Sequence, residues 1–134
     1  MRGSFHNIFK LRITKMENKR EFKKYVEAVG ASVVEQMMFV YYNVKGVDKD
    51  AIERSIARVL GATAAAKSNA NVFFDKGSKA FENRLDYTKA KRQFFKALFK
   101  KISGEFSAEV NGALSEFNAA LPEDVKKQNI EAVK

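Results

Sequence analysis

The chain contains no cysteine, and it has only one histidine and one proline. Without cysteine there are no disulfides and no thiolate nucleophiles, and most structural zinc sites are excluded. Because His6 is the only histidine, a Ser-His-Asp triad, a His-bearing zinc site or a helical di-iron site cannot be assembled within one chain. Of the usual catalytic side chains, the carboxylates are left as candidates.

The sequence also lacks any run of eighteen apolar residues, which excludes a membrane-spanning helix. A length of 134 residues fits one domain. We expect a single helical domain over residues 16–134, in a reducing, cytoplasmic location and without a cofactor. Residues 1–15 carry four cations and no acid. Three interpretations of this N-terminal extension stay open: a cloning scar or non-native start before Met16, a targeting segment, and a short strand through Phe9, Leu11 and Ile13.

The spacing of apolar residues predicts long helices between residue 16 and the single proline, Pro122. Steps of three and four predict a first helix from about Asn18 to Asn43, and the stripe consists of Phe22, Val26, Val29, Val33, Met37, Val40 and Val44. Lys45-Gly46 is expected to end this helix, and Asp48 to cap the next one. The β-branched and aromatic residues from Val33 to Val44 leave a strand as the alternative.

The second helix is predicted to place Ile52, Ile56, Val59 and Thr63 on its inner face and to extend through residues 61–67. This alanine-rich stretch favours a helix, and its small side chains suit a tight crossing with another helix. It also resembles a phosphate loop, but Ala66 stands where the motif GxxxxGK[ST] requires its second glycine. The helical interpretation is therefore preferred.

Residues 68–77 are predicted to form a turn that Phe73 and Phe74 fix to the core. Helical spacing resumes at Ser78 and continues to Leu121, with Ser103-Gly104 expected to divide it into two helices. Pro122 suits the first turn of a short last helix. The predicted fold is all-α, with four to five helices in a bundle or a bent helical array. An α+β fold with a strand near residues 33–44 is the alternative.

Charge is distributed unevenly along the chain. The total is +9, with +12 in residues 1–104 and −3 in residues 105–134, and a pI near 9.8 favours a polyanionic partner. The segment 89–101 is the densest, with six cations, three phenylalanines and no acid. The candidate nucleic-acid or anion-binding residues are Lys89, Lys91, Arg92, Lys96, Lys100 and Lys101.

On a helix, the apolar residues from Phe94 to Phe106 fall within an arc of about 140°, and Lys96, Lys100 and Lys101 lie outside it. The simplest interpretation is a core face with a solvated lysine rim. Alternatively, the rim binds phosphates, or an exposed aromatic face contacts a partner groove or a membrane surface. The membrane surface is the least favoured of these.

Two pairs of carboxylates, Glu82/Asp86 and Glu105/Glu109, each share one helix face. Such a pair can hold Mg²⁺ or act as acid and base if it is buried, although a solvated face is the preferred interpretation. Asp48-Lys-Asp50 resembles the start of a calcium loop but lacks the later glycine and glutamate, so we interpret it as a helix cap.

The leading hypothesis is a small non-enzymatic helical interaction protein that self-associates or meets another protein through aromatic surface and oppositely charged ends. The alternative is a sequence-tolerant nucleic-acid-binding protein that uses the basic face of residues 89–101. An enzyme acting through the carboxylate pairs comes third. No small-molecule substrate is implied.

Overall fold

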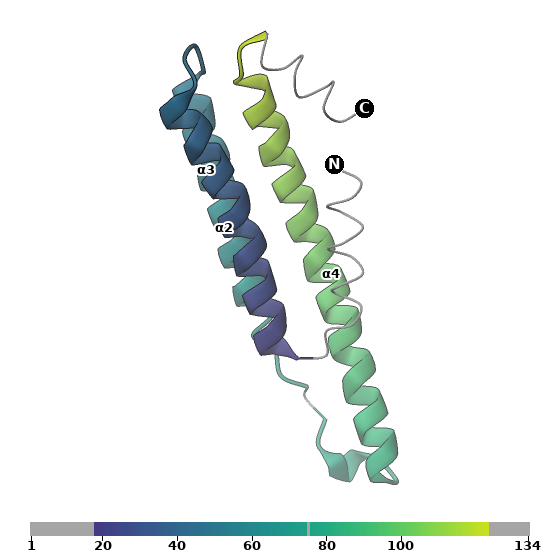
Figure 1. The fold of residues 1–134 in the computed structure, drawn as a ribbon. Helices are drawn as coiled ribbons and strands as arrows, with labels where there is room; N and C mark the ends of the chain where they lie inside the picture. The colour runs from purple at the N-terminus through teal and green to yellow at the C-terminus, as the bar shows by residue number, and fades with distance from the viewer. Residues whose placement is uncertain (1–17, 75, 124–134) are drawn as a thin grey trace, which may run out of the picture.

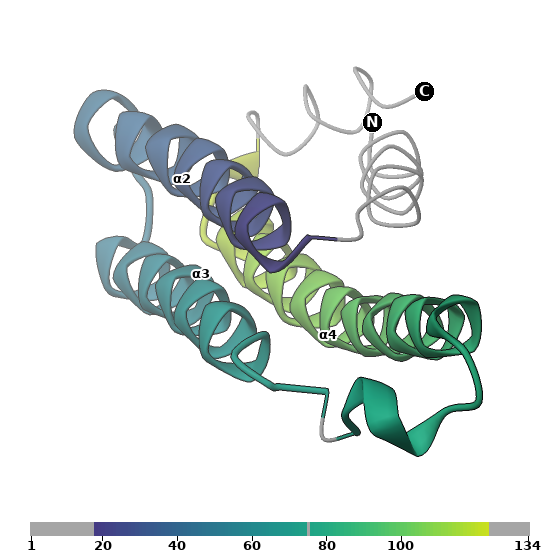
Figure 2. The same cartoon turned by 90° about the horizontal axis from the view of Figure 1, so that it is seen from below.

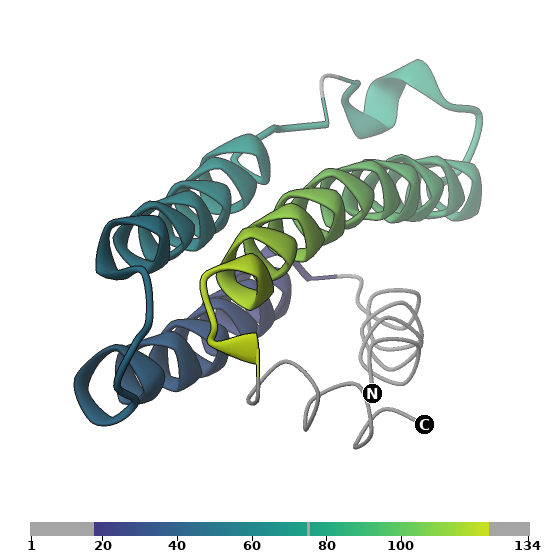
Figure 3. The ribbon, with the colours of Figure 1, turned by 90° about the horizontal axis from the view of Figure 1, so that it is seen from above.

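The computed structural model describes residues 18–74 and 76–123, and within these ranges the fold is all-α with no strand. Its elements are α2 (Lys19–Asn43), α3 (Lys49–Asn69), the 3-10 turn η1 (Ser78–Ala80) and α4 (Arg84–Ala119) (Figure 1). Helix α3 is antiparallel to both α2 and α4 and packs along both, whereas α2 and α4 touch much less. End-on views show the three helices at the corners of a triangle (Figures 2 and 3).

The beginning of each of the first two helices follows from a side-chain cap. The Asn18 side chain accepts hydrogen bonds from the backbone N–H groups of Arg20 and Glu21, at 2.7 and 3.3 Å. The carboxylate of Asp48 accepts one from the Ala51 N–H at 3.2 Å. Such caps satisfy the N–H groups that have no partner within a helix. Both predicted starts, and the assignment of Asp48 as a cap, are confirmed.

The alternative of a strand near residues 33–44 is wrong, because α2 runs without interruption to Asn43. The helical stripe is what the fold buries: Phe22, Val26, Val33 and Met37 are each at most 8% exposed. The free energy gained by burying this stripe therefore outweighs the β-propensity of the residues at its C-terminal end. After the helix, Gly46 has a φ of 81°, a conformation in which a side chain would be strained.

Helix α3 includes the alanine-rich stretch 61–67, as predicted. Ala62 and Ala66 are buried within a regular helix, so the stretch has neither the preceding strand nor the loop geometry that phosphate binding requires. On the inner face, Ile52 and Val59 are fully buried. The predicted tight crossing occurs where Gly30 of α2 faces Thr63 of α3.

The predicted break at Ser103-Gly104 is wrong, because α4 is continuous over 36 residues. The Ser103 hydroxyl donates to the Lys100 carbonyl at 3.0 Å, so it is satisfied inside the helix. A glycine inside a helix costs about 1 kcal/mol, whereas each large apolar side chain buried beside it contributes roughly 1.5–3 kcal/mol. Phe99, Ile102 and Phe106 are at most 3% exposed. Their burial therefore outweighs the low helix propensity of Ser103-Gly104, and the helix continues.

The described residues therefore contain three helices and one 3-10 turn, fewer than the four or five predicted. The last short helix, expected from Pro122 onward, lies largely outside the described residues, as do His6 and the strand expected in residues 1–15. The prediction for Phe73 is wrong and that for Phe74 holds in part. Phe73 is 83% exposed, whereas Phe74 is half-buried among Phe81, Tyr87 and Phe94.

From the close crossing of α2 and α3 we predict how a glycine-to-alanine change affects stability. A methyl group on Gly30 would meet Thr63 Cβ at 3.3 Å and lie still closer to its hydroxyl oxygen, which is committed to the Val59 carbonyl. We expect Gly30→Ala to destabilise the protein by about 1–2 kcal/mol in urea unfolding, because overpacking outweighs the gain in helix propensity.

Two other helical glycines provide the control. Gly61 and Gly104 have open space where a Cβ would be placed. Each change to alanine is expected to stabilise the protein by roughly 0.5–1 kcal/mol. Equal effects at all three positions would contradict the close approach of α2 and α3.

Candidate functional site

The fold gathers the cations of the described residues at one end of the molecule. Residues 19–30, 61–74 and 76–101 lie together at the lower end in Figure 1, and they carry fourteen Lys and Arg against four Asp and Glu. The opposite end, residues 31–60 and 102–123, has four cations against eight acids. We call these the basic end and the acidic end. Net charge in the described residues is thus +10 at the basic end (14 − 4) and −4 at the acidic end (4 − 8), a charge difference along the helix axes.

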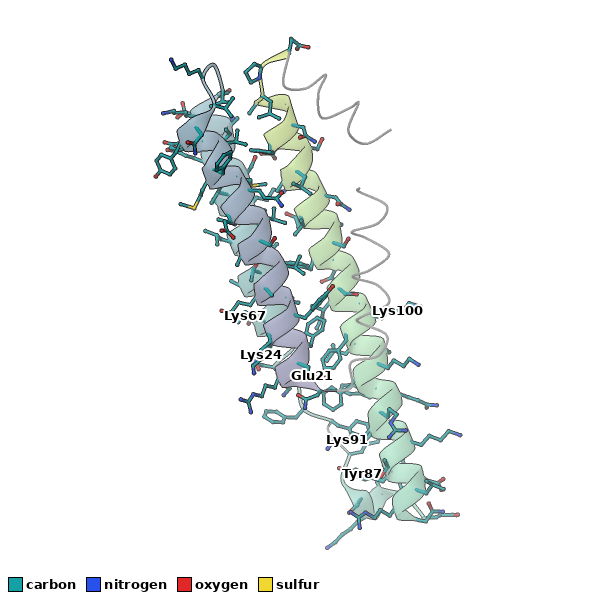
Figure 4. The ribbon with its side chains drawn as sticks, viewed as in Figure 1. Glu21, Lys24, Lys67, Tyr87, Lys91 and Lys100 are labelled. Carbon is teal, nitrogen blue, oxygen red and sulfur yellow. The ribbon has the colours of Figure 1, made fainter. Side chains whose placement is uncertain are left out.

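All six candidate binding residues from segment 89–101 are exposed on α4. The helical repeat places four of them within an arc of about 80°, forming a row of Lys89, Arg92, Lys96 and Lys100. Lys91 and Lys101 point away from this row. Figure 4 shows Lys91 on the lower part of α4 and Lys100 further up the same helix.

Lys91 shares an open hollow with a residue of α2 and with Arg92, which belongs to the row as well. Thr88, Lys91, Arg92 and Phe95 line the hollow from α4, and Lys19 lines it from the first turn of α2, around a volume of about 360 Å³. It forms because α4 extends beyond the start of α2, which leaves the inner side of residues 88–95 uncovered by that helix. We call it the basic hollow.

Aromatic rings lie beside the cations of the basic hollow. The Lys19 ammonium nitrogen lies 4.5 Å from the centroid of the Phe73 ring, and that of Lys91 lies 5.9 Å from the Tyr87 ring. At these distances a cation is attracted to the ring quadrupole. Lys19 and Phe73 were missed by sequence reasoning, because about seventy residues separate Lys19 from the α4 residues that it meets.

The aromatic face of segment 89–101 is largely covered, as the simplest sequence interpretation predicted. Phe99 is fully buried and stacks on Phe22 of α2, with ring centroids 4.6 Å apart. Phe95 packs against Phe99, and the half-buried Phe94 packs against Phe74. This face is therefore used within the fold, and it is not available as a continuous apolar surface.

The carboxylate pairs lie on exposed helix and loop surface. Glu109 of the second pair accepts a hydrogen bond from Arg58 Nε at 2.9 Å, and the same guanidinium reaches Glu116 at 2.8 Å. The hydrogen bond from Arg58 lowers the pKa of Glu109. Among the residues that the structure describes, no group of three His, Asp or Glu side chains is arranged to hold a metal ion.

Two further findings bear on function. Comparison of the chain with protein-family models, with curated proteins and with solved structures gives no match in any of the three. Within residues 18–74 and 76–123, no helix combines the length and apolar character that crossing a bilayer requires. The charge, exposure and placement of the residues described above are therefore the basis for assigning a function.

The ion pairs of Arg58 predict a pH dependence of stability. Because folding lowers the pKa of Glu109, its ionised form stabilises the protein above the pKa of the unfolded chain, near 4.5. This contribution is lost as the pH falls through the lower folded value. We expect Glu109→Gln to lower the urea midpoint at pH 7, and the difference from the original protein to shrink steadily below pH 4.5.

Glu105→Gln is the matched control for this experiment. Glu105 lies one turn earlier on α4 and has no ion pair with the part of the chain that the structure describes. Its substitution should shift the midpoint little at any pH. The same response for both variants would contradict a specific role of Arg58.

Proposed function

We propose that the protein is a non-enzymatic binding protein whose basic end holds nucleic acid with little sequence preference. The observation that carries this proposal is the meeting of Lys19 with Lys91 and Arg92 across the basic hollow. Cations from two helices that share one hollow present several N–H donors to a single phosphate group. Phosphate oxygens accept such charge-assisted hydrogen bonds more strongly than neutral ones.

The row on α4 extends this surface. From Lys89 to Lys100 the helix rises about 16 Å, since each residue adds about 1.5 Å. A row of that length follows several successive phosphates of a nucleic-acid strand, and each neutralised phosphate releases counterions. Lysine ammonium groups that contact phosphates carry no base-specific information, which supports binding without sequence preference.

This order of hypotheses reverses the one that the sequence alone favoured. The sequence placed an interaction protein first because of the phenylalanine content of the chain and the opposite net charge of its two parts. In the fold, Phe99 is buried and Phe94 and Phe95 are half-buried, so much of this surface is already used. The cations of the segment, by contrast, are exposed.

The test is binding of a fluorescently labelled nucleic acid of mixed sequence at two salt concentrations. We expect binding at 20 mM salt that weakens steeply by 200 mM. Lys19→Gln/Lys91→Gln should weaken binding and reduce the slope of log K against log salt by about 1.4–1.8, as expected for the loss of two phosphate contacts.

A matched control removes the same charge from the acidic end. Lys45 and Lys49 are also exposed lysines, and the Lys49 ammonium lies 5.0 Å from the Tyr41 ring, much as Lys19 lies beside Phe73. Lys45→Gln/Lys49→Gln should leave the slope within about 0.5 of its original value. Absence of binding at low salt, or equal losses in the two double variants, would refute the proposal.

Self-association is the second candidate function, and the exposed surface of α2 supports it. Met38, Phe39 and Tyr42 are 43, 65 and 72% exposed, and their spacing places them within about 100° of the helix circumference. They lie at the acidic end, so two antiparallel copies would bring each apolar patch toward a basic end. Such an arrangement is symmetric and closes as a dimer.

For this candidate, light scattering is expected to give twice 15.2 kDa at high protein concentration and low salt. Phe39→Ser/Tyr42→Ser should shift the mass toward one chain, because the association would lose its apolar contacts. Both side chains are exposed, so circular dichroism should show an unchanged helical content. A mass of 15.2 kDa at every concentration would exclude self-association.

A further inference from the structure

Phe73 is the most exposed of the large apolar side chains in the described residues, at 83%. Its neighbour Phe74 faces Phe81, Tyr87 and Phe94 and holds the connection between α3 and α4 against α4. Phe73 makes no comparable ring contact within the described residues, and the Lys19 ammonium is its neighbour. A single exposed phenylalanine is ordinary by itself. Phe73 differs from such a residue because it lies beside Lys19, a residue of the basic hollow.

Lys19 links the exposed ring to the basic hollow. The same side chain lies over the Phe73 ring and lines the hollow with Lys91 and Arg92. An aromatic platform and an open cationic hollow therefore adjoin each other. Within a nucleic-acid strand, each base is likewise a neighbour of a phosphate, to which it is joined through the sugar.

We propose that the basic end selects single-stranded over double-stranded nucleic acid, with an unpaired base stacked on Phe73 and a neighbouring phosphate held in the basic hollow. This inference rests on the proposed function. Proteins that bind single strands without sequence preference combine a cationic groove with aromatic rings on which bases stack. Every base has a π-face, so a stacking platform adds preference for unpaired strands without adding preference for sequence.

A duplex cannot use the ring in the same way. Its bases are stacked on each other and paired, so only phosphates and groove edges are offered to the protein. The row on α4 would still bind duplex phosphates, but Phe73 would contribute nothing. The two forms of nucleic acid should therefore respond differently to removal of the ring.

The experiment measures binding of a labelled 20-nucleotide oligo-dT and of a 20-base-pair duplex at the same low salt concentration, using fluorescence anisotropy. We expect the single strand to bind at least tenfold more tightly. Phe73→Ala should weaken single-strand binding about five- to hundredfold, the range typical of a lost base-stacking contact, and change duplex binding less than twofold. Phe73→Tyr should retain most of the preference, because it keeps the ring.

Leu60→Ala serves as the control, since it removes an exposed apolar side chain from the acidic end and lies outside the patch of Met38, Phe39 and Tyr42. It should leave both affinities unchanged. Equal binding of single strand and duplex, or a Phe73→Ala variant with full single-strand affinity, would overturn this inference and leave the proposed function intact.

Heparin is a polyanion without bases. It should bind the original protein and the Phe73→Ala variant equally well in competition with nucleic acid. A loss of heparin binding in the variant would show a charge effect instead of stacking and would also overturn the inference. Failure of both nucleic acids to bind would remove the proposed function itself.

Discussion

The stacking of Phe22 on Phe99 sets the register of α4 against α2, and the shape of the basic end depends on it. Phe22 lies three residues into α2, whereas Phe99 lies fifteen residues into α4. Both helices run in the same direction, so about twelve residues of α4, or about 18 Å, precede the start of α2. The inner side of this projecting part cannot be buried against α2. It is where Thr88, Lys91, Arg92 and Phe95 line the basic hollow.

Helix α3 makes this register possible because its side chains are small where the other helices approach. Ala62 and Ala66 are buried, and Thr63 faces Gly30 of α2. At the acidic end a different contact acts between α3 and α4, where the Arg58 guanidinium lies over Gly112 and reaches Glu109 and Glu116. These ion pairs are partly exposed, so each contributes little to stability. Close packing against α3 thus places both α2 and α4, and the ion pairs of Arg58 add a contact at the acidic end.

The sequence predicted the elements of the fold better than their ends and their number. Apolar periodicity and the cap at Asp48 are local signals, and they located α2 and α3 correctly. Ser103-Gly104 was misleading because local propensity at two residues competes with burial of three large side chains from the same helix. The candidate residues of segment 89–101 were visible as a charge run. The row follows from the helical repeat, whereas the hollow could not be predicted because it depends on where Lys19 lies in space.

The connection between α3 and α4 shows why adjacent, chemically identical residues can differ in function. Phe74 joins a cluster with Phe81, Tyr87 and Phe94, and this cluster holds residues 71–74 and 76–83 beside the projecting part of α4. Once Phe74 occupies that position, the adjacent Phe73 is left toward solvent and Lys19. The contacts of Phe74 thereby restrain the chain beside Phe73. In the proposed binding mode, a base that stacks on Phe73 would therefore cost less conformational entropy than one that must order a free loop, which is the general advantage of preorganisation.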